Sequence, residues 1–84
     1  MDARGNVSTM AEDIITIRAE IGAAVWKVVA PAGTAVAEDA PVVILESMKM
    51  EIPVSAPQAG TVVEVLVAEG EQVEEGQAIA TIRA

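Results

Sequence analysis

The chain has 84 residues, enough for one small domain, and its formal charge of −8 comes from thirteen acidic against five basic side chains. This balance argues against a nucleic-acid surface, which needs clustered Lys and Arg, and against binding to anionic membranes. His, Cys and Tyr are missing, so we do not expect an enzyme that works alone, nor a metal site built from scattered glutamates.

The N-terminal segment is polar and has no hydrophobic period. We expect residues 1–12 to form a disordered tail and residues 13–84 to form one domain. Met10 offers a second start site beside Met1, and the sequence leaves the choice between them open. Because we find neither an apolar signal region nor an apolar run long enough to cross a membrane, we expect a cytoplasmic protein.

The rest of the chain contains an internal repeat. The segment 19–45 aligns without a gap with the segment 56–82, at an offset of 37 residues. The identical pairs include small residues and valines that fall at matching points of each half: Ala19 with Ala56, Val25 with Val62, Val28 with Val65, Gly33 with Gly70, Val36 with Val73, and Glu38 with Glu75.

Each half has the pattern of a strand, a tight turn, a short strand, a second turn and a strand. Thirteen valines favour strands over helices. Residues suited to turns or to strand starts and edges stand between the apolar runs: Gly33 and Gly70 in the first turns, Asp39 and Gly76 in the second, and Pro41 and Pro53 at strand starts or edges. We predict an all-β fold, a small flattened barrel or sandwich of two four-stranded antiparallel sheets related by a pseudo-twofold axis.

The identical valines in the long strands are three residues apart, which does not fit strict alternation. A spacing of three predicts a β-bulge or a strong twist in each strand. We therefore expect Trp26 to be partly exposed, and Val25, Val28, Val62 and Val65 to be buried.

The segment ESMKMEIPVS joins the two halves and carries Lys49, one of only two lysines. The offset of 37 would place partners of this segment just beyond the paired strands, so we expect Lys49 on a hairpin tip at the end opposite both termini. A Met-Lys tip departs from the Asn-Gly or Asp-Gly that two-residue hairpins prefer, and such departures occur at functional sites. The alternative is an ordinary solvated lysine between two methionines that pack on the end of the sheet.

Met48-Lys49-Met50, with Glu46 three residues before the lysine, resembles the biotin attachment motif of biotin carboxyl carrier domains. The stretches IGAAVWKVVAPAG, AGTVVEVLVAEG and EGQAIATI are similar to the strands of that family, and the resemblance covers residues 14–83. It implies a barrel-sandwich fold, a biotin attached covalently to Lys49 by a biotin protein ligase, and recognition of the flanking Glu46, Ser47, Met48, Met50 and Glu51.

The resemblance further implies a non-catalytic carrier. Its arm would take activated carboxylate from a biotin carboxylase site to a carboxyltransferase site. We expect an enzyme of the acyl-CoA carboxylase type, as in fatty acid metabolism, and a domain that is monomeric by itself. Ser47 stands where many relatives have alanine, and the loop after Val29 is too short for the protruding thumb of some bacterial carriers. The carboxylated substrate stays open.

Two other functions are compatible with the sequence. A lipoyl carrier domain shares the fold and the position of the lysine, although its lysine usually stands between Asp and Ala, whereas both neighbours of Lys49 are Met. The other candidate is an acidic β-sandwich that binds a partner and whose lysine stays unmodified. Intact mass separates all three.

Overall fold

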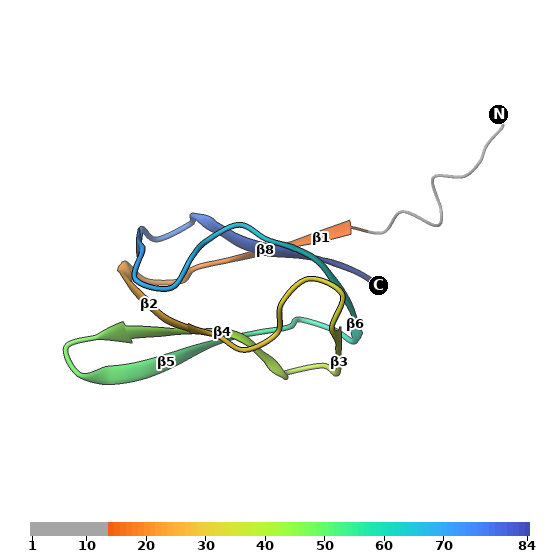
Figure 1. Ribbon diagram of the computed structural model, residues 1–84, viewed down its shortest axis with the longest axis horizontal. Coiled ribbons are helices and arrows are strands. Elements are labelled where there is room, and N and C mark those ends of the chain that lie inside the picture. The colour runs from red at the N-terminus through yellow and green to blue at the C-terminus, as the bar shows by residue number, and fades with distance from the viewer. Residues whose placement is uncertain (1–13) are drawn as a thin grey trace, which may run out of the picture.

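The computed structural model describes residues 14–84, and within that range the regular elements are eight β-strands (Figure 1). The predicted tail and Met10 lie outside the described residues. No helix in the described range is long and apolar enough to span a membrane. The strands are β1 Ile14–Arg18, β2 Ala23–Val28, β3 Ala35–Val36, β4 Pro41–Ser47, β5 Met50–Ser55, β6 Gly60–Val65, β7 Gln72–Val73 and β8 Ala78–Arg83.

The strands form two four-stranded antiparallel sheets, in the orders β1-β8-β6-β3 and β5-β4-β2-β7. Adding 37 to the residue numbers carries β1 onto β5, β2 onto β6, β3 onto β7 and β4 onto β8. The first sheet order then becomes the second. The predicted fold and its pseudo-twofold repeat are therefore confirmed, and each sheet combines strands from both halves of the chain.

The paired glycines bind each half to the other. The Gly33 amide donates a hydrogen bond of 2.7 Å to the Val62 carbonyl, and the Gly70 amide donates one of 2.8 Å to the Val25 carbonyl. Both glycines have φ near +90°, which a residue with a Cβ rarely adopts. The pairs Gly33 with Gly70 and Val25 with Val62 are thus positions at which the backbone of one half is hydrogen-bonded to that of the other.

The paired alanines lie at a second set of equivalent contacts. The Ala56 carbonyl accepts a hydrogen bond from the Asp39 amide, and the Ala19 carbonyl accepts one from the Gly76 amide, both at 2.8 Å. Ala19 and Ala56 are buried. Asp39 and Gly76 also share a positive φ, of 71° and 85°. The second turns of the two halves therefore have the same shape, although one is built on an aspartate.

The core lies between the two sheets and consists of aliphatic side chains from both halves. Its largest fully buried side chains are Leu45, Ile79, Ile82, Val25, Val42, Val43, Val62 and Val73. Pro41 begins β4, and Pro53 lies in β5, which is an edge strand of its sheet. A missing amide donor costs little at either place.

The predicted bulges are present. The pairing of β2 with β4 shifts between Val25 and Lys27, and the pairing of β6 with β8 shifts between Val62 and Glu64. The extra residue of the first bulge is Trp26, whose side chain is 47% exposed, as predicted. One prediction is wrong in part. Val25 and Val62 are buried, but Val28 and Val65 are only half-buried, because each lies beyond its bulge at the end of a strand.

The two ends of the domain differ. Figure 1 shows the hairpin of β4 and β5 extending from one end, while the start of β1 and the C-terminus lie at the other. The segment that contains Lys49 therefore lies opposite the C-terminus and the first described residue, as the offset of 37 predicts.

Candidate functional site

The hairpin between β4 and β5 places Lys49 on a two-residue loop. Ser47 pairs with Met50, so Met48 and Lys49 are the two loop residues. The two strands are held at their base, where Leu45 and Val43 are completely buried. A side chain at the tip is thus exposed to solvent on a support that the core fixes.

Both loop residues have a left-handed backbone. The φ angles are 52° at Met48 and 69° at Lys49, as in the primed turns that match the twist of hairpin strands. Residues other than glycine pay roughly 1–2 kcal/mol each for this conformation. Asn and Gly would form the same turn with less strain, so the Met-Lys sequence is explained by what the tip does rather than by folding.

The methionines beside the lysine do not pack on the sheet. Met48 is 91% exposed and Met50 is 64% exposed. This contradicts the alternative in which they cover the end of the sheet. Long, flexible thioether side chains adapt to differently shaped apolar surfaces, so their exposure at the tip suits contact with another molecule.

The other predicted flanking residues divide between the two faces of the hairpin. Glu46 and Glu51 are exposed, and they lie directly opposite each other across the strands. Like charges in this arrangement destabilise a sheet, by about 0.2–1 kcal/mol. Ser47 is half-buried and shares with Met50 the face that continues inward to Leu45. The structure therefore brings all the predicted residues together around Lys49.

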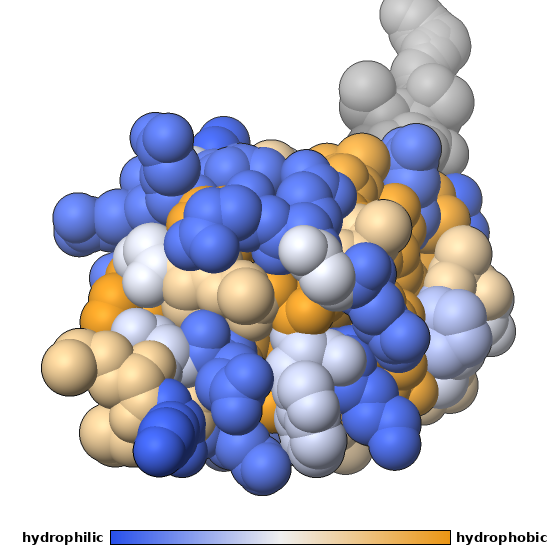
Figure 2. Space-filling view, turned by 60° about the vertical axis from the view of Figure 1, so that its left-hand side comes forward, coloured by the Kyte–Doolittle hydropathy of each residue, from blue (hydrophilic) through white to orange (hydrophobic). Residues whose placement is uncertain are grey.

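Around the tip, the exposed methionines give way to a mixed surface. In Figure 2, hydrophilic side chains cover most of the face that is turned toward the hairpin end, with apolar surface between them. Lys27, the other lysine, lies instead on the bulge of β2, with its Nζ 6.0 Å from the centre of the Trp26 ring. Within residues 14–84, no three His, Cys, Asp or Glu side chains are placed to hold a metal ion.

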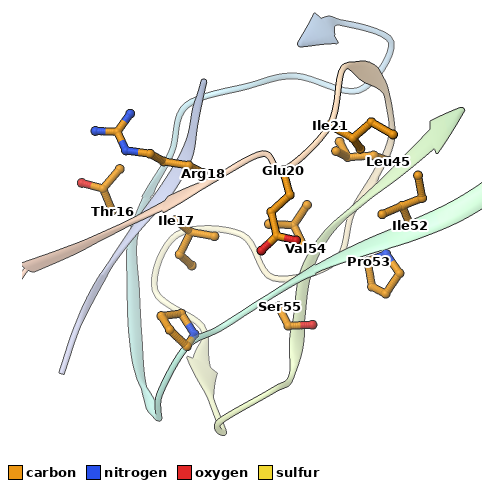
Figure 3. A pocket seen from close by; sticks show the side chains of 11 residues that line it. Thr16, Ile17, Arg18, Glu20, Ile21, Leu45, Ile52, Pro53, Val54 and Ser55 are labelled. Carbon is orange, nitrogen blue, oxygen red and sulfur yellow. The ribbon is translucent and has the colours of Figure 1, made fainter. Parts of the chain in front are cut away.

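A groove of about 380 Å³ lies between β1 and β5, the edge strands of the two sheets. Figure 3 shows the side chains along it. Because the repeat relates β1 to β5, the lining contains equivalent residues, such as Ile17 and Val54. Glu20, in the loop after β1, extends across the groove toward Val54 and Ser55 (Figure 3). The Arg18 guanidinium points away from the centre and donates to the Gly76 carbonyl at 3.0 Å.

The sequence alone does not predict this groove, because Glu20 does not differ from the other glutamates in its local sequence. Two signals were present in the sequence. The offset of 37 pairs the segment of β1 with that of β5, and Met50, Ile52 and Val54 alternate along one strand.

Comparison with known proteins places the chain among biotin proteins. A family model described as "biotin-requiring enzyme" matches residues 13–82. The "biotinylated protein TB7.3 homolog" of Mycobacterium leprae is 48% identical over 73 residues, which is 87% of this chain and 99% of that protein. The urea carboxylase of Kluyveromyces lactis matches with a TM-score of 0.80 and 35% identity, over 84% of this chain and 6% of the carboxylase. A single-chain, multi-domain long-chain acyl-CoA carboxylase matches with a TM-score of 0.78 and 35% identity, over 84% of this chain and 7% of its own.

Proposed function

We propose that this chain, which belongs to the family of biotin-requiring enzymes, carries its biotin on Lys49 and delivers carboxylate between two active sites of a biotin-dependent carboxylase. Its cofactor is biotin, and the domain is a non-catalytic carrier. The observation that supports Lys49 most strongly is its position, on a strained two-residue tip that extends from the body of the domain.

The tip fits the attachment of biotin. A biotinyl group joins to a lysine through an amide on Nζ, which needs an exposed primary amine and space for an enzyme around it. Lys49 is exposed, and so are Met48 and Met50 on either side. Lys27 lies instead on the bulge of β2 beside the Trp26 ring. We therefore assign a biotin protein ligase as the first partner, with Glu46, Ser47, Met48, Met50 and Glu51 within its contact area.

The carrier role follows from how the tip is supported. When biotin is attached, its ureido ring holds the carboxylate that a carboxylase transfers. This chain's own task is to present that ring: the buried Leu45 and Val43 fix the hairpin, while the tip stays exposed. Tethering raises the local concentration of the ring at a docked site to roughly the millimolar range. A biotin carboxylase and a carboxyltransferase are the expected partners, with the domain itself monomeric and cytoplasmic.

The acyl-CoA type of carboxylase is our choice of substrate class. A long-chain acyl-CoA carboxylase is one structural neighbour, and a urea carboxylase is another. Streptavidin capture of the native complex tests the choice. Co-purification of subunits that carboxylate acyl-CoA supports it, whereas urea-dependent activity in the captured material overturns it while leaving the carrier function intact.

The attachment site is tested by co-expression with a biotin protein ligase and measurement of intact mass. We expect one biotinyl group on the wild-type chain and on Lys27→Arg, and none on Lys49→Arg. The two variants remove the same chemical group from two exposed positions. Retention of biotin by Lys49→Arg would falsify the assignment, and a wild-type chain that stays unmodified would favour the acidic interaction module.

A further inference from the structure

An apolar path connects the hairpin tip with the groove between β1 and β5. Residues two apart along a strand share a face, so Met50, Ile52 and Val54 lie on the same side of β5. Ile52 and Val54 line the groove, and Met50 directly follows Lys49. A flexible chain attached to Lys49 thus has an apolar surface to follow from the tip back to the body of the domain.

The end of the groove nearest the tip, at Ile52, is within reach of such an arm. Ile52 is three residues beyond Lys49, roughly 10 Å away along an extended strand. A biotinylated lysine has about ten single bonds between its Cα and the ring, and at about 1.5 Å a bond these extend to roughly 12 Å. The volume of about 380 Å³ falls in the range of protein sites for small ligands, about 300–1,000 Å³.

The polar groups of the groove match the ring of biotin. The ring system has an apolar thioether side and a cyclic urea with two N–H donors and one carbonyl acceptor. Ile21 and Ile52 offer apolar contacts, and the Glu20 carboxylate, which extends across the groove, accepts hydrogen bonds. The two ureido N–H bonds point to opposite sides of the ring, so one carboxylate accepts one of them, and a hydrogen bond to an ionised acceptor is stronger than one between neutral groups. The Ser55 hydroxyl, which also lines the groove, can donate a hydrogen bond to the urea carbonyl.

We propose that the groove between β1 and β5 is a resting site for the biotin ring carried on Lys49, in which Glu20 accepts a hydrogen bond from one ureido N–H group. This inference rests on the proposed attachment at Lys49. A ring that already carries a carboxylate has one N–H donor fewer and one negative charge more. Glu20 therefore favours the unloaded ring in the groove and leaves the loaded arm free to reach its next enzyme.

Amide chemical shifts of the uniformly ¹⁵N-labelled domain, with and without biotin, test the proposal. Intact mass first confirms one biotinyl group. We expect biotinylation to shift the amides of Glu20 and Ile21, in the loop after β1, and of Ser55, in addition to those next to Lys49. Because a hydrogen bond to a charged group is at stake, Glu20→Ala should lower the ratio of docked to free arm at least about tenfold, which abolishes these distant shifts.

Glu38→Ala is the matched control, because Glu38 is also exposed but does not line the groove. It should leave the shifts of the β1–β2 loop unchanged. Shifts confined to residues 47–52, or equal distant shifts in Glu20→Ala and wild type, would overturn the resting site while the attachment at Lys49 stands. A wild-type chain that acquires no biotin on Lys49 would instead refute the proposed function itself.

Discussion

Replacing the two loop residues by the preferred pair, Met48→Asn with Lys49→Gly, should make the domain more stable and unable to accept biotin. Both residues have a left-handed backbone, with φ of 52° and 69°. Asn tolerates this conformation through its short polar side chain, and Gly adopts it without steric cost. Both side chains are exposed, so no packing in the core is lost.

The size of the effect follows from the two φ angles. Relief of left-handed strain contributes about 1–2 kcal/mol at each residue. The glycine also increases the conformational entropy of the unfolded chain, which reduces the gain in stability by roughly 0.5–1 kcal/mol. Because Asn is relieved of only part of the strain at its position, the net gain should lie near the lower end of this sum, about 1.5 kcal/mol. For a domain of this size, that raises Tm by roughly 6–12 °C.

Thermal unfolding followed by circular dichroism measures the gain, and Lys49→Arg is the matched control. Arginine removes the primary amine proposed to carry biotin but keeps a β-carbon at the same φ, so its Tm should equal that of the wild type. If the Asn-Gly variant is no more stable than the wild type, the two φ angles store no strain. The explanation of the Met-Lys tip as a functional departure from turn preference then fails.

Three further changes test the fold. Gly60→Ala should lower the free energy of unfolding by at least about 2 kcal/mol, in the upper part of the range for overpacking, because a Cβ there meets the Arg83 carbonyl. Gly22→Ala is the control, since its Cβ makes ordinary contacts and the change should be neutral or slightly stabilising. Equal urea midpoints for the two variants would contradict the register of β6 with β8. Gly33→Ala should lose about 1–2 kcal/mol through its φ of 92° alone, since its Cβ meets no atom within 4 Å, and an unchanged midpoint would show that the turn relaxes. Leu45→Ala should lose about 2–5 kcal/mol, because the side chain is completely buried; a loss under 1 kcal/mol in chemical denaturation would place it outside the core.

Much of the fold could be predicted because the sequence contains it twice. Val25 and Val62 match in the alignment because each buries its side chain in the core at the same point of its half, and the spacing to the next valine indicates the bulge at Trp26. The burial of Val28 could not be predicted in the same way. Its exposure depends on where the strand ends relative to the neighbouring sheet, and this is a property of the assembled halves rather than of either strand.

The candidate site was predicted unevenly for a similar reason. Lys49 is marked by local sequence, since a Met-Lys pair at a primed turn contradicts turn preference. No unusual local sequence indicates the groove. It exists because β1 and β5, distant in sequence, are the edge strands of two sheets that face each other. Glu20 matters only through that arrangement, so composition and spacing alone could not separate it from the glutamates of the surface.

The end of the domain opposite Lys49 has the same strand pairing as the base of the Lys49 hairpin, but within residues 14–84 no loop joins its two strands. A second lysine-bearing hairpin could be built there. Ile14 pairs with Arg83 as Glu51 pairs with Glu46, and the same offset of 37 relates the two pairs. A Ser-Met-Lys-Met bridge from Arg83 to Ile14 would close a twin hairpin, and new termini could open in an exposed turn. If Lys49 is the attachment site, such a circular permutant would carry one biotinyl group at each end of the domain. A mass spectrum with two biotinyl groups would show that a biotin protein ligase modifies both tips.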